Sequence, residues 1–448
     1  MTVRTRNTAA VVCASLGAWY LLFTAAPFSS PAADAPLKRD LDLFVCGLDL
    51  IQSNYYREVK ESELAYGALK GMCAALDPHS QFMDEEIYKE MKVETEGEFG
   101  GLGIEITIRD QFLIVVSPIE DTPAFKAGVR AGDRIIEIEG KSTKDLSLVE
   151  AVRKLRGPPG TVVRITVMRS GTGELLPFAM TRANIQIQSI KDAKVVKDGV
   201  GYLRMTQFQE RTGRDFEKAI QDLKKKGMRA LILDLRNNPG GLLQVAIEIA
   251  DKFIGGEKLL VYTKGRLRTQ NIEFKSPGKA AFPDCLLVVL VNKGSASGSE
   301  IVAGAVQDWG RGIILGSTTF GKGSVQSVLP LPDGSALRLT TAKYFTPKGR
   351  CIQKIGIEPD IVVELTDEEE IQLLVKHRLE KMISDNPDSK DMDEEKEELK
   401  KLSDVTDVQL ERAVDLLQGL LAHRGSSPGR GSDTLHAKKG TAKRPNAL

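Results

Sequence analysis

The sequence predicts a multidomain protein of mixed α/β class, with a helical N-terminal arm, a small β-rich domain, an α/β core and C-terminal helices. The length of 448 residues far exceeds one ordinary domain of about 150 residues. The apolar pattern changes twice along the chain, from helical spacing to short alternating strands, and then to strands that alternate with helices. Apolar residues make up 42% and charged residues 27%, which is typical of soluble globular proteins rather than of disordered chains.

The N-terminal segment, residues 1–33, has the residue order of an export signal. Arg4 and Arg6 precede an apolar run over residues 9–28, and small residues follow the run. The run is also close to the length that spans a bilayer, so the segment is predicted to be either a signal peptide or a membrane anchor. With either outcome we expect an exported protein that is periplasmic or extracytoplasmic, and membrane-anchored if the segment stays attached.

Helical patterns occupy both ends of the remaining chain. Residues 37–92 carry apolar side chains at helical spacing, as in ESELAYGALKGMCAAL, and predict a helical arm. Residues 366–423 predict a C-terminal helical segment that an acidic stretch, DSKDMDEEKEELKK, interrupts. Residues 424–448 are rich in Gly, Ser, Lys and Arg, which predicts a disordered basic tail. Helical arms of this kind often mediate dimers, so we expect a homo-oligomer that forms through the helical segments.

Residues 97–172 alternate short strands with glycine turns, and a helix is expected near residues 147–155. The run GGLGI and the later run PAFKAGVRAGDRIIEIEG resemble a PDZ domain. In such a domain, backbone N–H groups of a glycine-rich loop hold a terminal carboxylate, and a strand edge adds the peptide as a further strand. The resemblance implies a tail-binding loop formed by Gly101, Leu102, Gly103 and Ile104.

Residues 185–365 predict an α/β core with a largely parallel sheet, because strands alternate with helices. The unbroken apolar runs ALILD and LLVVLV are typical of buried parallel strands. The turn Gly240-Gly241 follows the first run, and the stretch GSASGSE follows the second. Ligands commonly bind at such strand-to-helix junctions, and a helix N-terminus stabilises negative charge there. Serines at a helix start are also ordinary N-caps, so this stretch alone does not indicate catalysis.

Lys322 lies between two glycines in TFGKGSVQ, on a strand-like segment rather than on an exposed helix. The chain has four histidines, and none falls in residues 185–364, which argues against a Ser-His-Asp arrangement in the core. A lysine can take a serine proton if burial lowers its pKa enough to leave the amine neutral. The composition is therefore consistent with serine chemistry that uses a lysine as the base.

Together these stretches resemble the C-terminal processing peptidases, also called tail-specific proteases, which are serine peptidases with a PDZ domain ahead of the catalytic core. The resemblance covers residues 37–364 and rests on motifs that occur in order. These are DPHSQFM in the arm, then YLRMTQF, DLRNNPGGLL, GSASGSE, TFGKGSVQ and GIEPD. The resemblance implies a Ser-Lys peptidase core that hydrolyses exported proteins near an apolar C-terminus, which the PDZ domain recognises.

The resemblance also implies catalytic roles for three side chains. Ser297 matches the nucleophile, Lys322 matches the general base, and Gln326 matches the residue that holds the lysine. Glutamine orients an amine without adding charge, so it does not raise the pKa of the lysine as a carboxylate would. Ser295 and Ser299 flank Ser297 and stay open as alternative nucleophiles.

An oxyanion hole is implied at the backbone N–H of Gly298 and at one N–H of the Gly240-Gly241 turn. The family usually has alanine at the position of Gly298. Because the donor is a backbone group, we expect it to survive that difference.

Composition limits the partners and cofactors. The chain has 62 basic and 61 acidic residues, a formal net charge of +1, so no nucleic-acid partner is expected. No cofactor is expected, nor a metal site, and pairing among the five cysteines stays open. The expected partners are protein substrates with free C-termini, and an adaptor protein and gating of the site by the PDZ domain are both left open.

Two other functions compete with peptidase activity. The first is an inert scaffold whose PDZ domain binds partner tails, and the second is a lipid or retinoid carrier, since a retinoid-binding protein of the eye shares the core fold. The presence of Ser297, Lys322 and Gln326 together argues against both alternatives.

Overall fold

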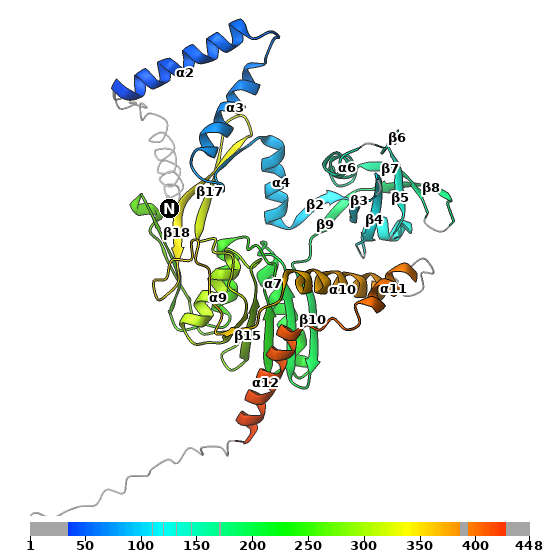
Figure 1. Cartoon of the computed structure of the whole chain (residues 1–448), viewed down its shortest axis with the longest axis vertical. Helices are drawn as coiled ribbons and strands as arrows, with labels where there is room; N and C mark the ends of the chain where they lie inside the picture. The colour runs from blue at the N-terminus through cyan, green and yellow to red at the C-terminus, as the bar shows by residue number, and fades with distance from the viewer. Residues whose placement is uncertain are drawn as a thin grey trace, which may run out of the picture. The chain divides into compact units, whose positions relative to one another are not determined.

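A computed structural model describes most of the chain and divides it into two units, residues 1–76 and 77–448 (Figure 1). The described residues are 35–109, 111–119, 121–130, 132–144, 146–169, 172–385 and 393–426. The predicted signal or anchor at 1–33, and the predicted tail from residue 427 onward, lie outside this part. In the described ranges, no helix is both long and apolar enough to cross a membrane.

The first unit contains the helices α2 (Ala35–Asn54) and α3 (Glu61–Ala74). Cys73 is the buried residue of α3. Several large apolar side chains of α2 stay exposed, namely Leu37, Leu41, Leu43, Phe44, Val45, Leu50 and Ile51. The helical prediction for this part of the arm agrees with the structure, but α2 leaves much of its apolar surface uncovered.

The second unit opens with a strand where the arm pattern over residues 37–92 predicted helix. Residues Gln81–Met83 form β1, which pairs antiparallel with β18 (Ala336–Phe345). The Asp77 carboxylate accepts the Ser80 N–H at 2.9 Å, and Ser80 Oγ in turn accepts the Thr340 N–H at 3.1 Å. The turn therefore directs the chain onto the sheet edge before α4 (Glu85–Glu96) begins at its Asp84 cap.

The PDZ-like region forms one antiparallel sheet with strand order β3-β4-β5-β7-β8. Its elements are β3 (Ile104–Arg109), β4 (Phe112–Pro118), α5 (Pro123–Ala127), β5 (Arg134–Ile138), β6 (Lys141–Ser142), α6 (Leu148–Leu155), β7 (Val162–Met168) and β8 (Leu175–Thr181). The sheet continues past residue 172, where the sequence placed the end of this domain, because β8 pairs with β7 along its whole length. The strands β2 (Glu98–Gly101) and β9 (Ala183–Gln186) pair where the chain enters and leaves the domain.

The core contains a second sheet with strand order β10-β11-β12-β15-β16-β19, in which all neighbours except β10 and β11 run parallel. Its strands are β10 (Ile190–Lys197), β11 (Val200–Met205), β12 (Ala230–Asp234), β15 (Leu286–Val291), β16 (Ile313–Gly316) and β19 (Ile361–Val362). This arrangement confirms the predicted α/β class and the predicted parallel sheet.

Alternation along β12 separates the two faces of this sheet. Leu231 and Leu233 join the cluster that includes α7 (Thr212–Lys225), α8 (Leu243–Asp251) and α9 (Gly298–Asp308). Ala230 and Ile232 join a second cluster with Ala413 and Leu417 of α12 (Val408–Ser426), the red helix of Figure 1. The parallel sheet is thus covered on both faces, and α12 is part of the core rather than an appendage.

A third sheet completes the core and carries the TFGKGSVQ segment. It contains β1, β18, β13 (Leu259–Gly265), β14 (Glu273–Lys275) and β17 (Ser324–Pro330), with the short helix η1 (Arg268–Gln270) between β13 and β14. The C-terminal segment adds α10 (Asp367–Asp385) and α11 (Asp393–Lys401) before α12, so helix extends to residue 426 rather than 423.

Candidate active site

Ser297 lies in the turn between β15 and α9, directly before the first residue of the helix. Its backbone has φ 53° and ψ −110°, a region that favours glycine. The side chain is 7% exposed, and its Oγ lies 3.0 Å from the Tyr344 hydroxyl. The chain therefore holds a serine hydroxyl at a helix N-terminus in a conformation that serine seldom adopts.

The two neighbouring serines have different surroundings. Ser295 Oγ donates to the Leu235 carbonyl at 2.8 Å, and Ser299 Oγ donates to the Asn238 carbonyl at 2.9 Å. Both serines are fully buried. Their protons are used in main-chain contacts that hold the turn, whereas the hydroxyl of Ser297 lies beside the hydroxyl of Tyr344.

The loop after β12 fits closely against this turn. The Asn238 carbonyl accepts the Ala296 N–H at 3.0 Å, and the Asn238 side chain accepts the Gly240 N–H at 2.9 Å. Gly240 has φ +98°, and a Cβ there would lie 2.7 Å from both Ser297 Cβ and Gly298 N. Only glycine permits this approach. Because the Gly240 N–H is already bound, Gly241 is the other glycine of this turn that can supply an N–H.

Gly298 leaves a small space beside the Phe208 ring. A Cβ at this position would lie 3.2 Å from Phe208 and 3.3 Å from the Ala246 methyl group. An alanine, as the family usually has, would require these neighbours to shift by a few tenths of an ångström. The backbone donor at the start of α9 does not depend on that choice.

Glu300 connects the Ser297 turn to the segment that carries Lys322. Its Oε2 accepts the Ser297 N–H at 2.8 Å and the Lys322 N–H at 2.9 Å, and its Oε1 accepts the Gly321 N–H at 2.7 Å and the Thr319 hydroxyl at 2.6 Å. The side chain is fully buried. Burial raises the pKa of Glu300, while these four hydrogen bonds oppose that shift.

Lys322 has a pKa below that of a free lysine. Burial is the main cause, the Arg338 cation adds to it, and the Glu300 carboxylate acts in the opposite direction. In the part of the chain that the structure describes, Gln326 makes no hydrogen bond to Lys322, and its Nε2 donates to Ser324 Oγ at 2.8 Å. The structure thus joins the Lys322 and Ser297 backbones through Glu300, but it does not place Gln326 on the lysine.

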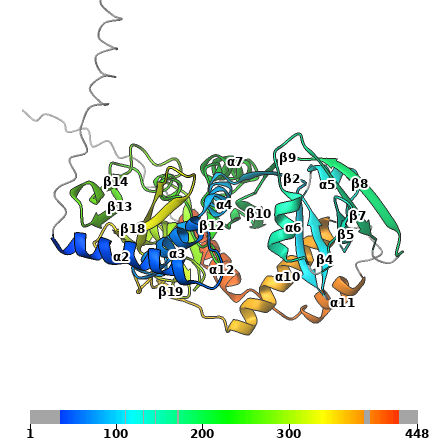
Figure 2. The ribbon, with the colours of Figure 1, turned by 90° about the horizontal axis from the view of Figure 1, so that it is seen from above.

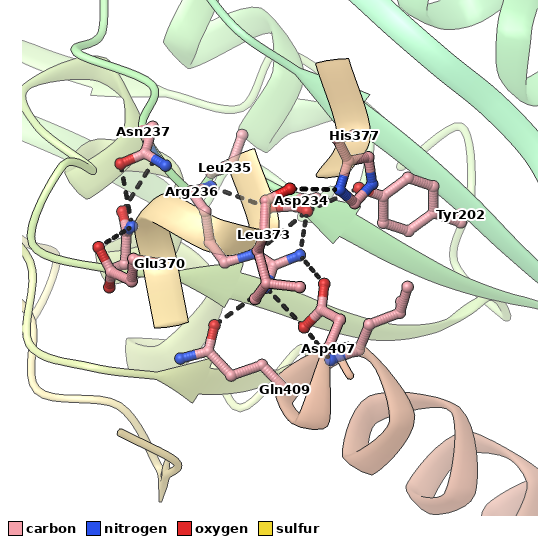
Figure 3. Close-up of polar contacts among 12 residues, drawn as sticks. Tyr202, Asp234, Leu235, Arg236, Asn237, Glu370, Leu373, His377, Asp407 and Gln409 are labelled. Atoms are coloured by element: carbon pink, nitrogen blue, oxygen red, sulfur yellow. Dashed lines mark hydrogen bonds and ion pairs between the residues drawn. The ribbon is translucent and has the colours of Figure 1, made fainter. Parts of the chain in front are cut away.

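The loop after β12 is also supported by a buried ion-pair cluster around Arg236 (Figure 3). Arg236 donates to Asp234 at 2.7 Å, to Asp407 at 2.8 and 2.9 Å, and to Gln409 at 3.1 Å. Burial acts to raise the pKa of Asp234, but the Arg236 charge and the hydrogen bonds that Asp234 accepts hold it below its ordinary value. Asp407 and Gln409 belong to the C-terminal segment, so that segment fixes the loop that reaches Ser297.

In the PDZ-like domain, the predicted tail-binding loop leads into an open sheet edge. The Leu102 carbonyl accepts the Ala124 N–H at 3.0 Å, and Gly103 has φ +75° with no room for a Cβ. Ile104 begins β3, which is the end strand of this sheet, and α6 lies beside it (Figure 2). Gly101 ends β2. An extended peptide has an unpaired strand edge here to which it can hydrogen-bond.

Two residues of this site had no assigned role in the sequence. Glu300 has a detectable signal, since a Ser followed three residues later by Glu at a helix start predicts a capping box. Tyr344 has none, because 47 residues separate it from Ser297. Among the residues that the structure describes, no cluster of three or more His, Cys, Asp or Glu could hold a metal ion.

Comparisons with known proteins identify the family of the chain. Residues 199–363 match the profile of peptidase family S41, residues 114–169 match that of a PDZ domain, and residues 29–87 match that of the activating protease CtpB N-terminal domain. A photosystem II D1 C-terminal processing protease of known structure is 31% identical, covering 71% of this chain and 86% of that one, with a TM-score of 0.44.

Two curated relatives are more similar in sequence. A carboxy-terminal-processing protease of Bartonella bacilliformis is 46% identical over 319 residues, which cover 70% of this chain and 73% of that protein. The carboxy-terminal processing protease CtpB of Bacillus subtilis is 37% identical over 348 residues, which cover 77% of this chain and 72% of that protein. The chain therefore belongs to the carboxy-terminal processing proteases, which are serine peptidases of family S41.

Proposed function

We propose that this protein is an endopeptidase in which Ser297 attacks the substrate carbonyl and a neutral Lys322 takes the serine proton. The observation that carries this proposal is the shared Glu300 oxygen, which accepts the backbone N–H of both residues at 2.8 and 2.9 Å. That contact fixes the two segments against each other. The lowered pKa of Lys322 provides the neutral amine that proton removal requires.

Gln326 is assigned to holding the lysine during the reaction. Its Nε2 donates to Ser324 Oγ, so its carbonyl oxygen is left to accept a proton from the Lys322 amine or ammonium. Reaching the lysine requires a rotation of the Gln326 side chain away from its contacts with Ser324 and Thr340. This rotation gives a gating step that tail binding at the PDZ domain can control.

The oxyanion hole is assigned to the backbone N–H groups of Gly298 and Gly241. Gly298 is the first residue of α9, where the helix dipole stabilises negative charge. Gly241 belongs to the turn that packs on the Ser297 turn. Gly240 lets its turn approach the Ser297 turn closely, but its own N–H is not available because it donates to the Asn238 side chain.

Substrate selection is assigned to the β3 edge and the loop before it. A peptide tail that adds to β3 places its carboxylate at the loop formed by Gly101, Leu102, Gly103 and Ile104. Ile104 and Ile106 on β3 are half-buried apolar residues, which favours tails with apolar side chains. The substrates are accordingly proteins with free, apolar C-termini.

Location and assembly follow from the two ends of the chain. The export-type pattern at residues 1–33 supports substrates in an extracytoplasmic compartment. The exposed apolar side chains of α2 support a homo-oligomer that forms through the helical segments. An adaptor protein that delivers substrates is compatible both with an extracytoplasmic location and with a homo-oligomer.

The test uses the chain without residues 1–33 and an unfolded protein that ends either in apolar or in charged residues. Wild type, Ser297→Ala and Lys322→Ala are incubated with both substrates, and fragments are identified by mass spectrometry. Lys343→Ala is the matched control, since Lys343 is an exposed lysine on β18. We expect cleavage by wild type and Lys343→Ala only, with preference for the apolar tail. Cleavage that survives Ser297→Ala or Lys322→Ala would refute the dyad, and equal cleavage of both tails would refute the tail preference.

A further inference from the structure

Tyr344 contacts the proposed nucleophile directly. It lies on β18, and its hydroxyl is 3.0 Å from Ser297 Oγ. The side chains of Ser297 and Tyr344 are 7% and 5% exposed, so water competes little for this bond. In the described part of the chain, no other side chain hydrogen-bonds Ser297 Oγ.

The chemistry of the two hydroxyls indicates which one donates. Burial raises the pKa of Tyr344, so the phenol holds its proton more tightly than a free tyrosine does. A phenol is also more acidic than an alcohol and is therefore the stronger hydrogen-bond donor. When Tyr344 donates to Ser297, the serine proton is left free to point toward a base.

Tyr344 also holds the segment of the proposed base. Its backbone N–H donates to the Gly323 carbonyl at 2.8 Å, and Gly323 directly follows Lys322. The pairing of β17 with β18 continues from this point. The residue that touches the nucleophile with its side chain therefore positions the lysine segment with its main chain.

We propose that Tyr344 is a further catalytic residue, whose hydroxyl donates a hydrogen bond to Ser297 Oγ while negative charge develops on that oxygen. This inference rests on the proposed function of Ser297 and Lys322. It assigns the tyrosine to the reaction itself, and not only to the resting arrangement of the site.

In acylation, Lys322 takes the Ser297 proton, Oγ forms a bond to the carbonyl carbon, and the carbonyl electron pair moves to the oxyanion. The C–N bond then breaks, and the Lys322 ammonium returns the proton to the leaving amine. In deacylation, water attacks, Lys322 takes a water proton, and the C–Oγ bond breaks as that proton passes to Oγ. Tyr344 keeps its own proton throughout and stabilises Oγ both as it attacks and as it leaves.

The test compares Tyr344→Phe with wild type and with Tyr262→Phe, using a peptide ending in apolar residues. Tyr262 is a suitable control because it lies on the neighbouring strand β13 and stacks on Phe345. We expect kcat to fall about 10- to 100-fold in Tyr344→Phe, with KM and the unfolding midpoint nearly unchanged. Tyr262→Phe should retain wild-type kinetics.

The pH profile separates a catalytic role from a structural one. The acid limb reports Lys322, whose pKa depends on burial, Arg338 and Glu300, so Tyr344→Phe should lower the plateau without moving that limb. Replacing Tyr344 with a ring-fluorinated tyrosine keeps a stronger donor and should retain kcat. A displaced acid limb would indicate a disturbed site, and would count against the proposal.

Equal or faster cleavage by Tyr344→Phe would overturn the proposal, because the hydroxyl would then only hold the Ser297 side chain in place before the reaction. Ser297→Ala distinguishes this result from failure of the proposed function. If Ser297→Ala stays active, the dyad itself is wrong. If Ser297→Ala is inactive while Tyr344→Phe is fully active, only the assignment of Tyr344 is wrong.

Discussion

Asp407 and Arg236 form a bidentate ion pair across 171 residues of sequence, with Nη1–Oδ1 and Nη2–Oδ2 distances of 2.9 and 2.8 Å. Arg236 lies two residues before Asn238, whose carbonyl accepts the Ala296 N–H at 3.0 Å. Ala296 directly precedes Ser297. The C-terminal segment is therefore linked through one short loop to the turn that carries the proposed nucleophile.

Removing the charge of Asp407 should weaken both the fold and the activity. Asp407→Asn keeps the cap on the Leu410 N–H, because asparagine caps as well as aspartate, but it places an amide group against the Arg236 guanidinium. We expect a loss of about 1–3 kcal/mol in the free energy of unfolding. We also expect kcat to fall by about tenfold, since the loop after β12, which carries the proposed oxyanion donor Gly241, loses a support.

The matched control for Asp407→Asn is Asp415→Asn, which removes the same charge from an exposed position of α12. Denaturant unfolding and cleavage kinetics are measured on both variants. Equal effects in the two variants would mean that the net charge of α12, rather than its contact with Arg236, is responsible.

Glu300→Gln should inactivate the enzyme while leaving most of the core intact. The amide keeps one acceptor oxygen and replaces the other with an NH₂ group, which cannot accept the backbone N–H groups that this oxygen accepts in Glu300. We expect cleavage to fall on the order of 100-fold, because the amide cannot accept both the Ser297 and Lys322 N–H groups on one side and the Gly321 N–H on the other. Thr319→Val removes one donor to Glu300 together with the acceptor of the Ile357 N–H, leaves the three backbone contacts of Glu300 in place, and should have a clearly smaller effect on kcat. If Thr319→Val proved as damaging as Glu300→Gln, the shared contact with Ser297 and Lys322 would not be the important one.

Gly240→Ala should abolish cleavage through contact with the Ser297 turn rather than through its backbone conformation alone. A Cβ at Gly240 meets Ser297 and Gly298 at 2.7 Å, whereas a Cβ at Gly227 has nothing within 4 Å. Both positions have positive φ, +98° and +89°, so both alanines carry a conformational cost of about 1–2 kcal/mol. Thermal unfolding and kcat of both variants separate the two causes. A normal kcat in Gly240→Ala would show that the close approach is unimportant.

The pH dependence of kcat/KM should respond to Arg338. Activity needs neutral Lys322, so it rises with pH through the lysine pKa, which burial and then the Arg338 cation lower. Arg338→Met removes that cation and raises the Lys322 pKa, so the acid limb should move to higher pH. Lys343→Met removes a positive charge from an exposed site on the same strand and should leave the limb in place. An unmoved limb in Arg338→Met would exclude this electrostatic contribution.

The sequence predicts local features of this protein better than it predicts contacts between distant segments. The parallel sheet follows from the unbroken apolar strands, and the proposed catalytic positions rest on short motifs at strand ends. The strand β1 was missed, because Gln81–Met83 has a strand conformation only through its pairing with β18, more than 250 residues later. A pattern confined to one segment contains no information about such a partner.

The same reason explains which site residues were missed. Tyr344 and Asp407 act through side-chain bonds to residues 47 and 171 positions away. Neither has a spacing motif of its own. Glu300 is different, since its capping-box position is visible in the sequence, but its bond to Lys322 depends on the segment before β17 lying against the start of α9.

The positive φ of Ser297 affects which substitutions at this position stabilise the protein. Ser297→Ala and Ser297→Gly both lose the hydroxyl, but only glycine relieves a conformation that costs an L-residue about 1–3 kcal/mol. The glycine variant should therefore be the more stable of the two inactive proteins. Under the proposed mechanism, catalysis and folding thus make opposite demands at this position. A lineage that no longer needed the reaction would be free to accept glycine here and become more stable, so selection for activity alone keeps a serine in this turn.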